Sequence, residues 1–523
     1  MKRLLLCCLL LGGALFSCSK EETGGTPDKV EISLSTLTFQ LSRDGSATAD
    51  ITVTPSTIPL EEKDFRLENP DQEMVSIHYT SRIEQTGEGL FRLTILDSGG
   101  EESYDETPRL YCDKAGFVSE PLHVSRGAFA IPVVRVTTEG PVLDKETWVA
   151  GTIEIDGKGY LPSLERMAVE VKGRGNTTWG WEKKPYALKL DSKKEVLGMP
   201  KHKRWCLIAN YMDRTNLRNR VAYHIGANSR LAWTTRNEFV ELYFNGSYDG
   251  LYLLTEQIKV DKNRVNVTEM EPTDNSGEAV TGGYLLEFDT NYDEEQRFRS
   301  ATTDIPVNIK YPDPEELTPE QFAYIRDYVN RIDEVVAAQS MNQGSDDDAP
   351  FEYLDMESLA DFWICFEVTA NHEMLHPKSI YFYKERSGKL FAGPIWDFDY
   401  ETLVSHTATR WVNYGMTYPS SIYPWHERNW WNMLLLHNAT FRRAVKSRWQ
   451  EWYPFLQRVP DFIEHERKAI AQAEVRNRER WPSINDTGYP NGDEWLSFDE
   501  AVDRLKEVYT TRTEWLNSQI SAW

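Results

Sequence analysis

The chain of 523 residues is poor in cysteine. Of its six cysteines, only Cys112, Cys206 and Cys365 follow Cys18. These three are scattered, and their spacing gives neither a CxxC pair nor a zinc site. Each lies in an apolar neighbourhood, so we expect each to be a small buried side chain.

Basic side chains are also scarce. Lys and Arg number 58 against 82 Asp and Glu, which gives a formal net charge of −24. Such an acidic surface repels nucleic acid and anionic lipid, so we predict no nucleic-acid partner. The usual consequence of this charge is solubility, although basic partners remain compatible with it.

Long apolar runs are missing after the N-terminus, and no later segment reaches 18 apolar residues. The chain begins with Met1-Lys2-Arg3, continues with an apolar run at 4–16, and reaches Ser17-Cys18. A basic start and a short apolar run predict a signal peptide over residues 1–17. Leu15-Phe16-Ser17-Cys18 resembles the lipobox of bacterial lipoproteins, which implies lipidation of Cys18. The alternative is an ordinary signal peptide with a chance cysteine.

A lipid on Cys18 would anchor the protein to a membrane outside the cytoplasm, at the outer membrane or cell surface. Residues 18–29 are polar and glycine-containing, and predict a flexible tether. Residues 30–128 then alternate apolar and polar positions in short runs between turn residues. This pattern favours an all-β, immunoglobulin-like antiparallel sandwich, with a spacer or adhesive role as the default.

Residues 131–523 mix strands with amphipathic helices and predict a large α+β domain. Asn245-Gly246 between two apolar runs predicts a tight hairpin. The expected helices are 213–226, starting at a cap on Asp213 or Thr215, and 318–339, 356–370, 428–480 and 498–522. The tryptophans of the last two ranges are expected mainly in the core, although they leave sugar-stacking surfaces open.

The stretch 371–400 carries the clearest chemical pattern. A polar loop containing Glu373 precedes a predicted hairpin, and Asp397 and Asp399 stand at the end of its second strand. This order matches a kinase catalytic segment, in which a hairpin sets the distance between a catalytic acid and a metal-binding Asp. The alternative is that the two aspartates merely cap a turn or form salt bridges.

Two further stretches are basic. A glycine-rich turn with Arg174 precedes Lys183, Lys184 and Lys189, and backbone amides with positive charge suit an anion. Arg214 and Arg218 are four residues apart and share a helix face. The alternatives are a solvated basic hairpin for the first stretch, and structural bridges from the arginine pair to Glu256 or Glu287 for the second.

Five ordered motifs combine these stretches: R-G-N-T-T-W…K-K-P-Y-x-L-K-L, L-I-A-N-Y-x-D-R-T-x-L-R-N, N-G-x-Y-x-G-L-Y-L-L-T-E-Q-I, G-G-Y-L-L-E-F-D and G-P-I-W-D-F-D. Together they resemble the CotH family of atypical protein kinases, named for a spore-coat kinase. The resemblance covers about residues 131–523. It implies a divergent protein-kinase-like fold and phosphorylation of protein Ser or Thr with ATP and Mg²⁺ or Mn²⁺.

The resemblance also assigns residues. It implies that Asp397, with Asp399, holds the metal, and that Lys184 or Lys189 contacts ATP. Further positions match family motifs and are assigned to the cofactor side of the site: Arg174, Arg218 and Glu256.

One segment departs from the spore-coat pattern. Lys378-Ser379 replaces the family's His-Asn pair, and the expected Asp falls near Met374, which leaves Glu373 as the candidate base. The sequence resembles a Bacteroidetes lipoprotein branch of the family. The alternatives to an active kinase are an inactive kinase-like or glycan-binding surface lipoprotein, or a purely structural one. The partner is then a protein acceptor or a surface glycan.

Overall fold

The structure is a computed structural model, which describes residues 30–41, 46–70, 76, 78–98, 103–127, 130–339, 348–375, 377–414, 430–484 and 491–523. The predicted signal peptide, the tether at 18–29 and Cys18 lie outside the described residues. The chain divides into two compact units, Met1–Ala130 with Gly159–Leu161, and Ile131–Lys158 with Pro162–Trp523. No helix among the described residues combines the length and apolar character needed to cross a bilayer.

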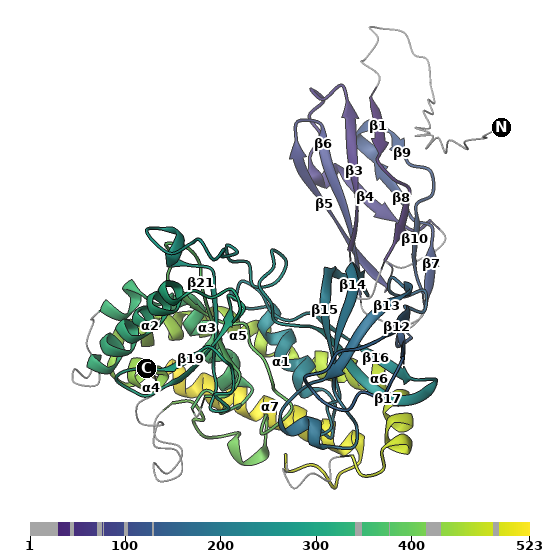
Figure 1. Cartoon of the computed structure of the whole chain (residues 1–523). Coiled ribbons are helices and arrows are strands. Elements are labelled where there is room, and N and C mark those ends of the chain that lie inside the picture. The colour runs from purple at the N-terminus through teal and green to yellow at the C-terminus, as the bar shows by residue number, and fades with distance from the viewer. Residues whose placement is uncertain are drawn as a thin grey trace, which may run out of the picture. The chain divides into compact units, whose positions relative to one another are not determined.

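The first unit is β-rich (Figure 1). One sheet has the order β1 (Glu31–Leu34), β3 (Ser46–Thr54), β6 (Leu90–Asp97) and β5 (Tyr79–Gly87). Two three-stranded sheets complete it: β2 (Thr38–Gln40), β10 (His123–Arg126) and β7 (Tyr104–Glu106); and β4 (Phe65–Glu68), β8 (Arg109–Cys112) and β9 (Phe117–Val118). The antiparallel prediction fails at one pair, because β2 and β10 run parallel.

Period-two patterning explains the core of this unit. In β3 the side chains of Ala49, Ile51 and Val53 are buried, whereas their neighbours in the strand are exposed. Successive strand residues point to opposite faces, so this alternation buries one face of the sheet. Phe91 and Leu93 of the adjoining strand β6 belong to the same apolar core.

The second unit begins with a closed barrel (Figure 1). Its strands, in order around the barrel, are β11 (Val133–Thr138), β12 (Val149–Asp156), β13 (Leu164–Gly173), β14 (Tyr186–Val196), β15 (Met199–Ile208), β17 (Ser247–Glu256) and β16 (Asn237–Phe244). Asn245 and Gly246 both have positive φ, 50° and 81°, and form the predicted two-residue hairpin between β16 and β17.

A five-stranded sheet follows in the same unit. Its order is β19 (Arg297–Arg299), β20 (Pro306–Tyr311), β18 (Tyr284–Phe288), β21 (Ile380–Lys384) and β22 (Leu390–Ala392). The central strands β18 and β21 are antiparallel, with Phe288 opposite Ile380. The end of β18 therefore lies beside the start of β21, and the loop segments at both places meet.

Seven α-helices are present in the described residues: α1 (Arg218–Ala227), α2 (Pro319–Gln339), α3 (Met356–Val368), α4 (Trp430–His437), α5 (Ala439–Leu456), α6 (Val459–Arg480) and α7 (Phe498–Ser521). Local caps explain several starts. The Asp355 side chain accepts from the Ser358 amide at α3, and Ser497 with Glu500 forms a capping box at α7. Cys206 and Cys365 are free and buried in the large core of this unit, as expected.

Two sequence-based boundaries were wrong. Helix α1 begins at Arg218 and not at Asp213, because the Asp213 carboxylate accepts from the amides of Thr215 and Arg218 and holds the intervening residues in turns. Strand β22 ends at Ala392, so Asp397 does not terminate a strand. The peptide bond between Gly393 and Pro394 is cis, and proline cannot donate to a strand ladder.

Candidate functional site

Four carboxylates from three separate segments form an acidic cluster: Glu373 from the loop after α3, Asp397 and Asp399 from the loop after β22, and Asp289 directly after β18. Burial raises the pKa of Glu373 well above its ordinary value, and the charges of the other three raise it further. The sequence prediction that Glu373, Asp397 and Asp399 lie together is thus met by the fold. Asp289 is a fourth carboxylate, and no sequence pattern predicted its place in the site.

Asp397 is the solvent-accessible member of the cluster. Its side chain is exposed, whereas Trp396 and Phe398 on either side are buried. Its backbone has φ 70°, a left-handed conformation that is uncommon for a non-glycine residue. The Phe398 amide donates to Asn219 Oδ1 at 2.8 Å and fixes this turn. Although Asp397 reaches solvent, desolvation by the surrounding protein raises the pKa of its carboxyl, and Arg174 and Lys378 lower it.

Asp399 is buried, with 3% of its surface exposed. Burial, together with the nearby charges of Asp397 and Asp213, raises the pKa of its carboxyl to about 8. No hydrogen bond from another described residue reaches this carboxylate. A buried carboxylate without donors is unstable as an anion, so it takes up a proton or a cation.

Glu373 shows the same deficit. It is 8% exposed, and its Oε2 atom is enclosed without a hydrogen-bond partner in the described chain. Its backbone is held firmly, because the amide donates to Asn371 Oδ1 at 2.9 Å and the carbonyl accepts from the Lys378 amide at 3.0 Å. The unpartnered oxygen therefore sits on a fixed loop beside Asp397.

An apolar pocket borders this loop. It is lined by Phe288, Met374, Leu375, Pro377, Phe382 and Trp430, among others. The low polarity of this surrounding helps to explain why desolvation is the largest contribution to the raised pKa of Glu373. The pocket offers no charged lining for a phosphate.

Two cations face the acidic cluster. Arg174 stacks over the Trp396 ring, with the guanidinium carbon 5.4 Å from the ring centroid. In the described part of the chain, the Arg174 guanidinium makes no hydrogen bond or ion pair. Lys378 Nζ donates to Asn291 Oδ1 at 2.9 Å. Arg174 was predicted from the sequence; Lys378 had been noted only as a departure from the family pattern.

The predicted lysines lie elsewhere. Lys184 Nζ donates to the Trp179 carbonyl at 2.8 Å, and Lys189 forms an ion pair with Glu170 at 2.7 Å. Lys183 is fully buried and donates to the carbonyls of Ala209 and Leu251. None of these contacts involves Asp397. The ATP contact of Lys184 or Lys189 stays a prediction.

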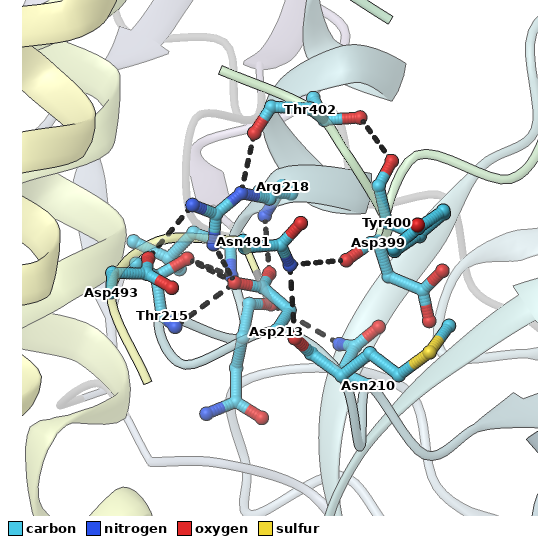
Figure 2. A network of polar contacts seen from close by, with 12 residues as sticks. Asn210, Asp213, Thr215, Arg218, Asp399, Tyr400, Thr402, Asn491 and Asp493 are labelled. Carbon is cyan, nitrogen blue, oxygen red and sulfur yellow. Dashed lines mark hydrogen bonds and ion pairs between the residues drawn. The ribbon is translucent and has the colours of Figure 1, made fainter. Parts of the chain in front are cut away.

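Arg218 belongs to a buried ion network (Figure 2). Its guanidinium bonds Asp213 at 2.5 Å, Asp493 at 2.7 Å and the Thr402 carbonyl at 2.7 Å. The arginine pair therefore forms structural ion pairs, as the alternative interpretation of the sequence expected. Their partners, however, are not Glu256 and Glu287. Arg214 bonds Glu474 at 2.6 Å. The cofactor role of Arg218 stays a prediction, and all three guanidinium nitrogens bond other residues of the protein.

Glu256 is likewise enclosed in the protein. It accepts from Arg236 Nε at 2.9 Å and from Trp233 Nε1 at 3.2 Å, and Arg264 Nε lies 3.6 Å away. These contacts join the end of β17 to the residues before β16 and after β17. Its predicted place on the cofactor side also stays a prediction.

A basic patch surrounds Trp148, which directly precedes β12. Lys172, Lys189 and Arg204 place their charges 5.0, 5.9 and 4.8 Å from the centroids of the Trp148 rings. Lys189 pairs with Arg204 across β14 and β15. Arg174 directly follows β13, two residues after Lys172, and its guanidinium is close enough to Asp397 for that carboxylate to raise its pKa. Trp148, Lys172 and Arg204 were missed from the sequence.

The acidic cluster supplies some, but not all, of the ligands that a divalent cation needs. No group of three or more His, Cys, Asp or Glu side chains in the described ranges is already arranged to hold a metal ion. Mg²⁺ in kinases is commonly held by one or two carboxylates together with substrate phosphates. Asp397 and Asp399 supply two, and the unpartnered oxygen of Glu373 adds negative potential.

Comparison with known proteins identifies the family. The model of the CotH kinase protein family matches residues 171–516. The chain belongs to the CotH family. This membership connects it with kinase-related function, and the kinase family implies use of ATP. The CotH match begins inside β13, so β11 and β12 precede it although they belong to the same closed barrel.

The other comparisons add little. No curated protein matches the CotH chain. A solved structure described as FdeC, a broadly conserved Escherichia coli adhesin, aligns at 9% identity with a TM-score of 0.18. The alignment covers 35% of this chain and 59% of that one.

Proposed function

We propose that this CotH protein is an extracytoplasmic phosphotransferase that transfers phosphate from Mg-ATP to Ser or Thr of a protein. The supporting observation is the unpartnered Oε2 of Glu373, fixed beside Asp397 and Asp399. Carboxylates that repel one another favour the binding of a divalent cation between them. ATP, the phosphoryl donor, binds together with such a cation.

Each acid has a role in this proposal. Asp397 and Asp399 would hold Mg²⁺ or Mn²⁺, which neutralises charge on the phosphates of ATP. Glu373 would accept the proton of the acceptor hydroxyl. Without a cation, the neighbouring carboxylates raise the pKa of Glu373 and keep it protonated. A cation bound beside Asp397 would lower this pKa, so that Glu373 loses its proton and can act as a base.

The donor phosphates require cations, and the basic patch around Trp148 supplies them. Arg174 stands nearest the acids, and Lys172, Lys189 and Arg204 continue on the same side of the barrel. Burial and the charge of Arg204 lower the pKa of Lys172, whereas the carboxylates of Glu146, Asp144 and Glu294 raise it less. In this proposal Arg174 and Lys189 would contact the donor phosphates, and Lys189 would exchange its ion pair with Glu170 for the phosphate. Lys184, Arg218 and Glu256 have structural contacts that explain their positions.

The proposal also includes the finer architecture and location. The second unit would be a divergent protein-kinase-like domain, and the first an immunoglobulin-like sandwich that acts as a spacer. The protein would be a lipoprotein of the Bacteroidetes type, anchored through Cys18. Replacing Cys18 with Ala should move the protein from the membrane fraction to the soluble fraction, and unchanged membrane retention would contradict the anchor.

The alternative is a surface lipoprotein with an inactive kinase-like domain that binds a protein or glycan. One observation favours it: Ser379, at the position of the family's metal-binding Asn, has φ 53° and offers only a hydroxyl. Thermal melting separates the two proposals, because a ligand stabilises the native state that binds it. ATP with Mn²⁺ should raise the melting temperature of an active kinase, whereas glycans should do so for a glycan-binding protein.

Label transfer from ATP to acceptor proteins tests the activity directly. The full chain, incubated with Mg²⁺ or Mn²⁺, should transfer label, and Asp397→Ala should abolish transfer. Asp191→Ala is the matched control, because Asp191 is an exposed aspartate of β14. Glu373→Gln should lower the rate about 10²–10⁴-fold, the usual contribution of a general base. Equal transfer by Asp397→Ala would refute the metal assignment.

A further inference from the structure

Asn491 binds the backbone of the loop that carries Asp399. Its Nδ2 donates to the carbonyls of Asp399 and Met212, both at 2.9 Å, and its Oδ1 accepts from the Glu401 amide at 2.7 Å (Figure 2 shows the contact with Asp399). The side chain is 3% exposed. One amide group thus fixes the chain on both sides of Tyr400.

An asparagine is the side chain that suits this place. The carbonyls of Asp399 and Met212 only accept hydrogen bonds, and the Glu401 amide only donates. A single planar amide supplies two donors and one acceptor. An aspartate would direct a carboxylate oxygen at two carbonyls, and an alanine would leave three buried backbone groups without partners.

The same loop is anchored a second time. Arg218 donates to the Thr402 carbonyl and to Asp493, two residues beyond Asn491. Glu401 has φ 44°, a left-handed conformation that persists when the surrounding contacts determine it. The segment 491–493 and the start of α1 therefore determine the backbone of 399–402 together.

We propose that Asn491 is a positioning residue that orients Asp399, and through this loop Asp397, for the divalent cation. The proposal rests on the metal site of the proposed function and deepens it. Partners that hydrogen-bond to a metal-ligating segment fix the ligand's direction, and their loss commonly weakens metal binding about 10–100-fold. The Asp399 carboxylate receives no bond from the network itself, so its direction depends on its backbone.

Two variants test the inference. Asn491→Ala removes the side-chain amide, whereas Asn491→Gln keeps the amide but places it one methylene further from the backbone. The second variant keeps the test possible if Asn491→Ala does not fold. The matched control is Asn477→Ala, because Asn477 is equally buried but binds the amide of Leu251 in the barrel. Thermal melting confirms that each full-length variant is folded.

Mn²⁺ binding without nucleotide, followed by electron paramagnetic resonance, is the first readout. The dissociation constant should rise at least about tenfold in Asn491→Ala, rise less in Asn491→Gln, and stay unchanged in Asn477→Ala. In the transfer assay, the Mg²⁺ concentration for half-maximal rate should rise in parallel, with the KM of the acceptor unchanged.

The outcomes separate the inference from the function it rests on. A wild-type protein that neither binds Mn²⁺ nor transfers phosphate overturns both. A wild-type protein that binds Mn²⁺, with folded Asn491 variants that bind it equally well, overturns the inference alone. A similar loss in Asn477→Ala would show a general effect of destabilisation and would also overturn it.

Discussion

The backbone amide of Ser379 donates to Asp289 Oδ2 at 3.0 Å. This bond joins the residue before β21 to the residue after β18, at the place where the two strands are adjacent in the sheet. The other oxygen of Asp289 accepts from the Asn291 amide at 2.6 Å. One carboxylate therefore holds both loop segments that border the acidic cluster.

We expect Asp289→Ala to destabilise the protein by about 1 kcal/mol, because it leaves the half-buried amides of Ser379 and Asn291 without their acceptor. Urea denaturation of the full chain measures the change. Asp293→Ala is the control, since Asp293 is an exposed residue of the same loop. A loss no greater than that of the control would show that the Ser379 contact contributes little.

The pH dependence of stability should report the acidic cluster. The pKa of Asp399 is raised from its ordinary 3.8 to about 8, so the folded state keeps a proton that the unfolded state releases. Stability from this group is complete below about pH 4 and is lost as the pH rises to about 8. Each unit of such a shift corresponds to about 1.4 kcal/mol.

Urea midpoints between pH 4 and 9, measured in a metal chelator, test this sign. They should fall with rising pH, and Asp399→Asn should reduce the slope, whereas the exposed Asp191→Asn should not. Mn²⁺ should restore stability at pH 8, because a cation replaces the missing proton. A slope identical in Asp399→Asn would assign the pH effect to the net charge instead.

Arg218→Met should lower the free energy of unfolding by about 3–5 kcal/mol, the usual loss when one partner of a buried ion pair is removed. Asp213 and Asp493 would both remain buried without their cation. The exposed pair of Arg331 and Glu334 provides the control, and Arg331→Met should leave the urea midpoint unchanged. A normally stable Arg218→Met that has lost ATP binding would favour the cofactor role predicted from the sequence.

Lys172→Gln and Arg204→Gln should each weaken binding of Mg-ATP about 10- to 150-fold, because each loses one charge-assisted hydrogen bond of roughly 1.5–3 kcal/mol. Lys184→Gln should change it little, because Lys184 is bonded to the Trp179 carbonyl. Isothermal titration of the full-length variants gives the three values. The reverse order would restore Lys184 as the ATP contact and remove the basic patch from the site.

Local patterns predicted much of the fold. The Asn245-Gly246 hairpin and the helix at 319–339 follow from turn chemistry and apolar periodicity, which are set by residues near in sequence. Helix α1 was placed too early because Asp213 looks like a cap, whereas its carboxylate reaches as far as the Arg218 amide and stabilises turns.

The part of the candidate site that lies within one short segment could also be predicted from the sequence. Glu373 and Asp397 belong to one local segment, and their proximity follows from the short hairpin between them. Asn491 acts on Asp399 across 92 residues, and an isolated asparagine in a polar loop gives no sign of this. Lys172 and Arg204 meet at Trp148 only because β12 to β15 lie side by side.

The closed barrel has a practical consequence for anyone who excises the part of the chain that matches the CotH family. A fragment starting at Val171, where the family match starts, would lose β11, β12 and most of β13. Strands β14 and β16 would then each lose a neighbour, and unpaired strand edges invite intermolecular pairing. Such a fragment should precipitate, whereas a fragment starting before Ile131 retains every strand of the barrel.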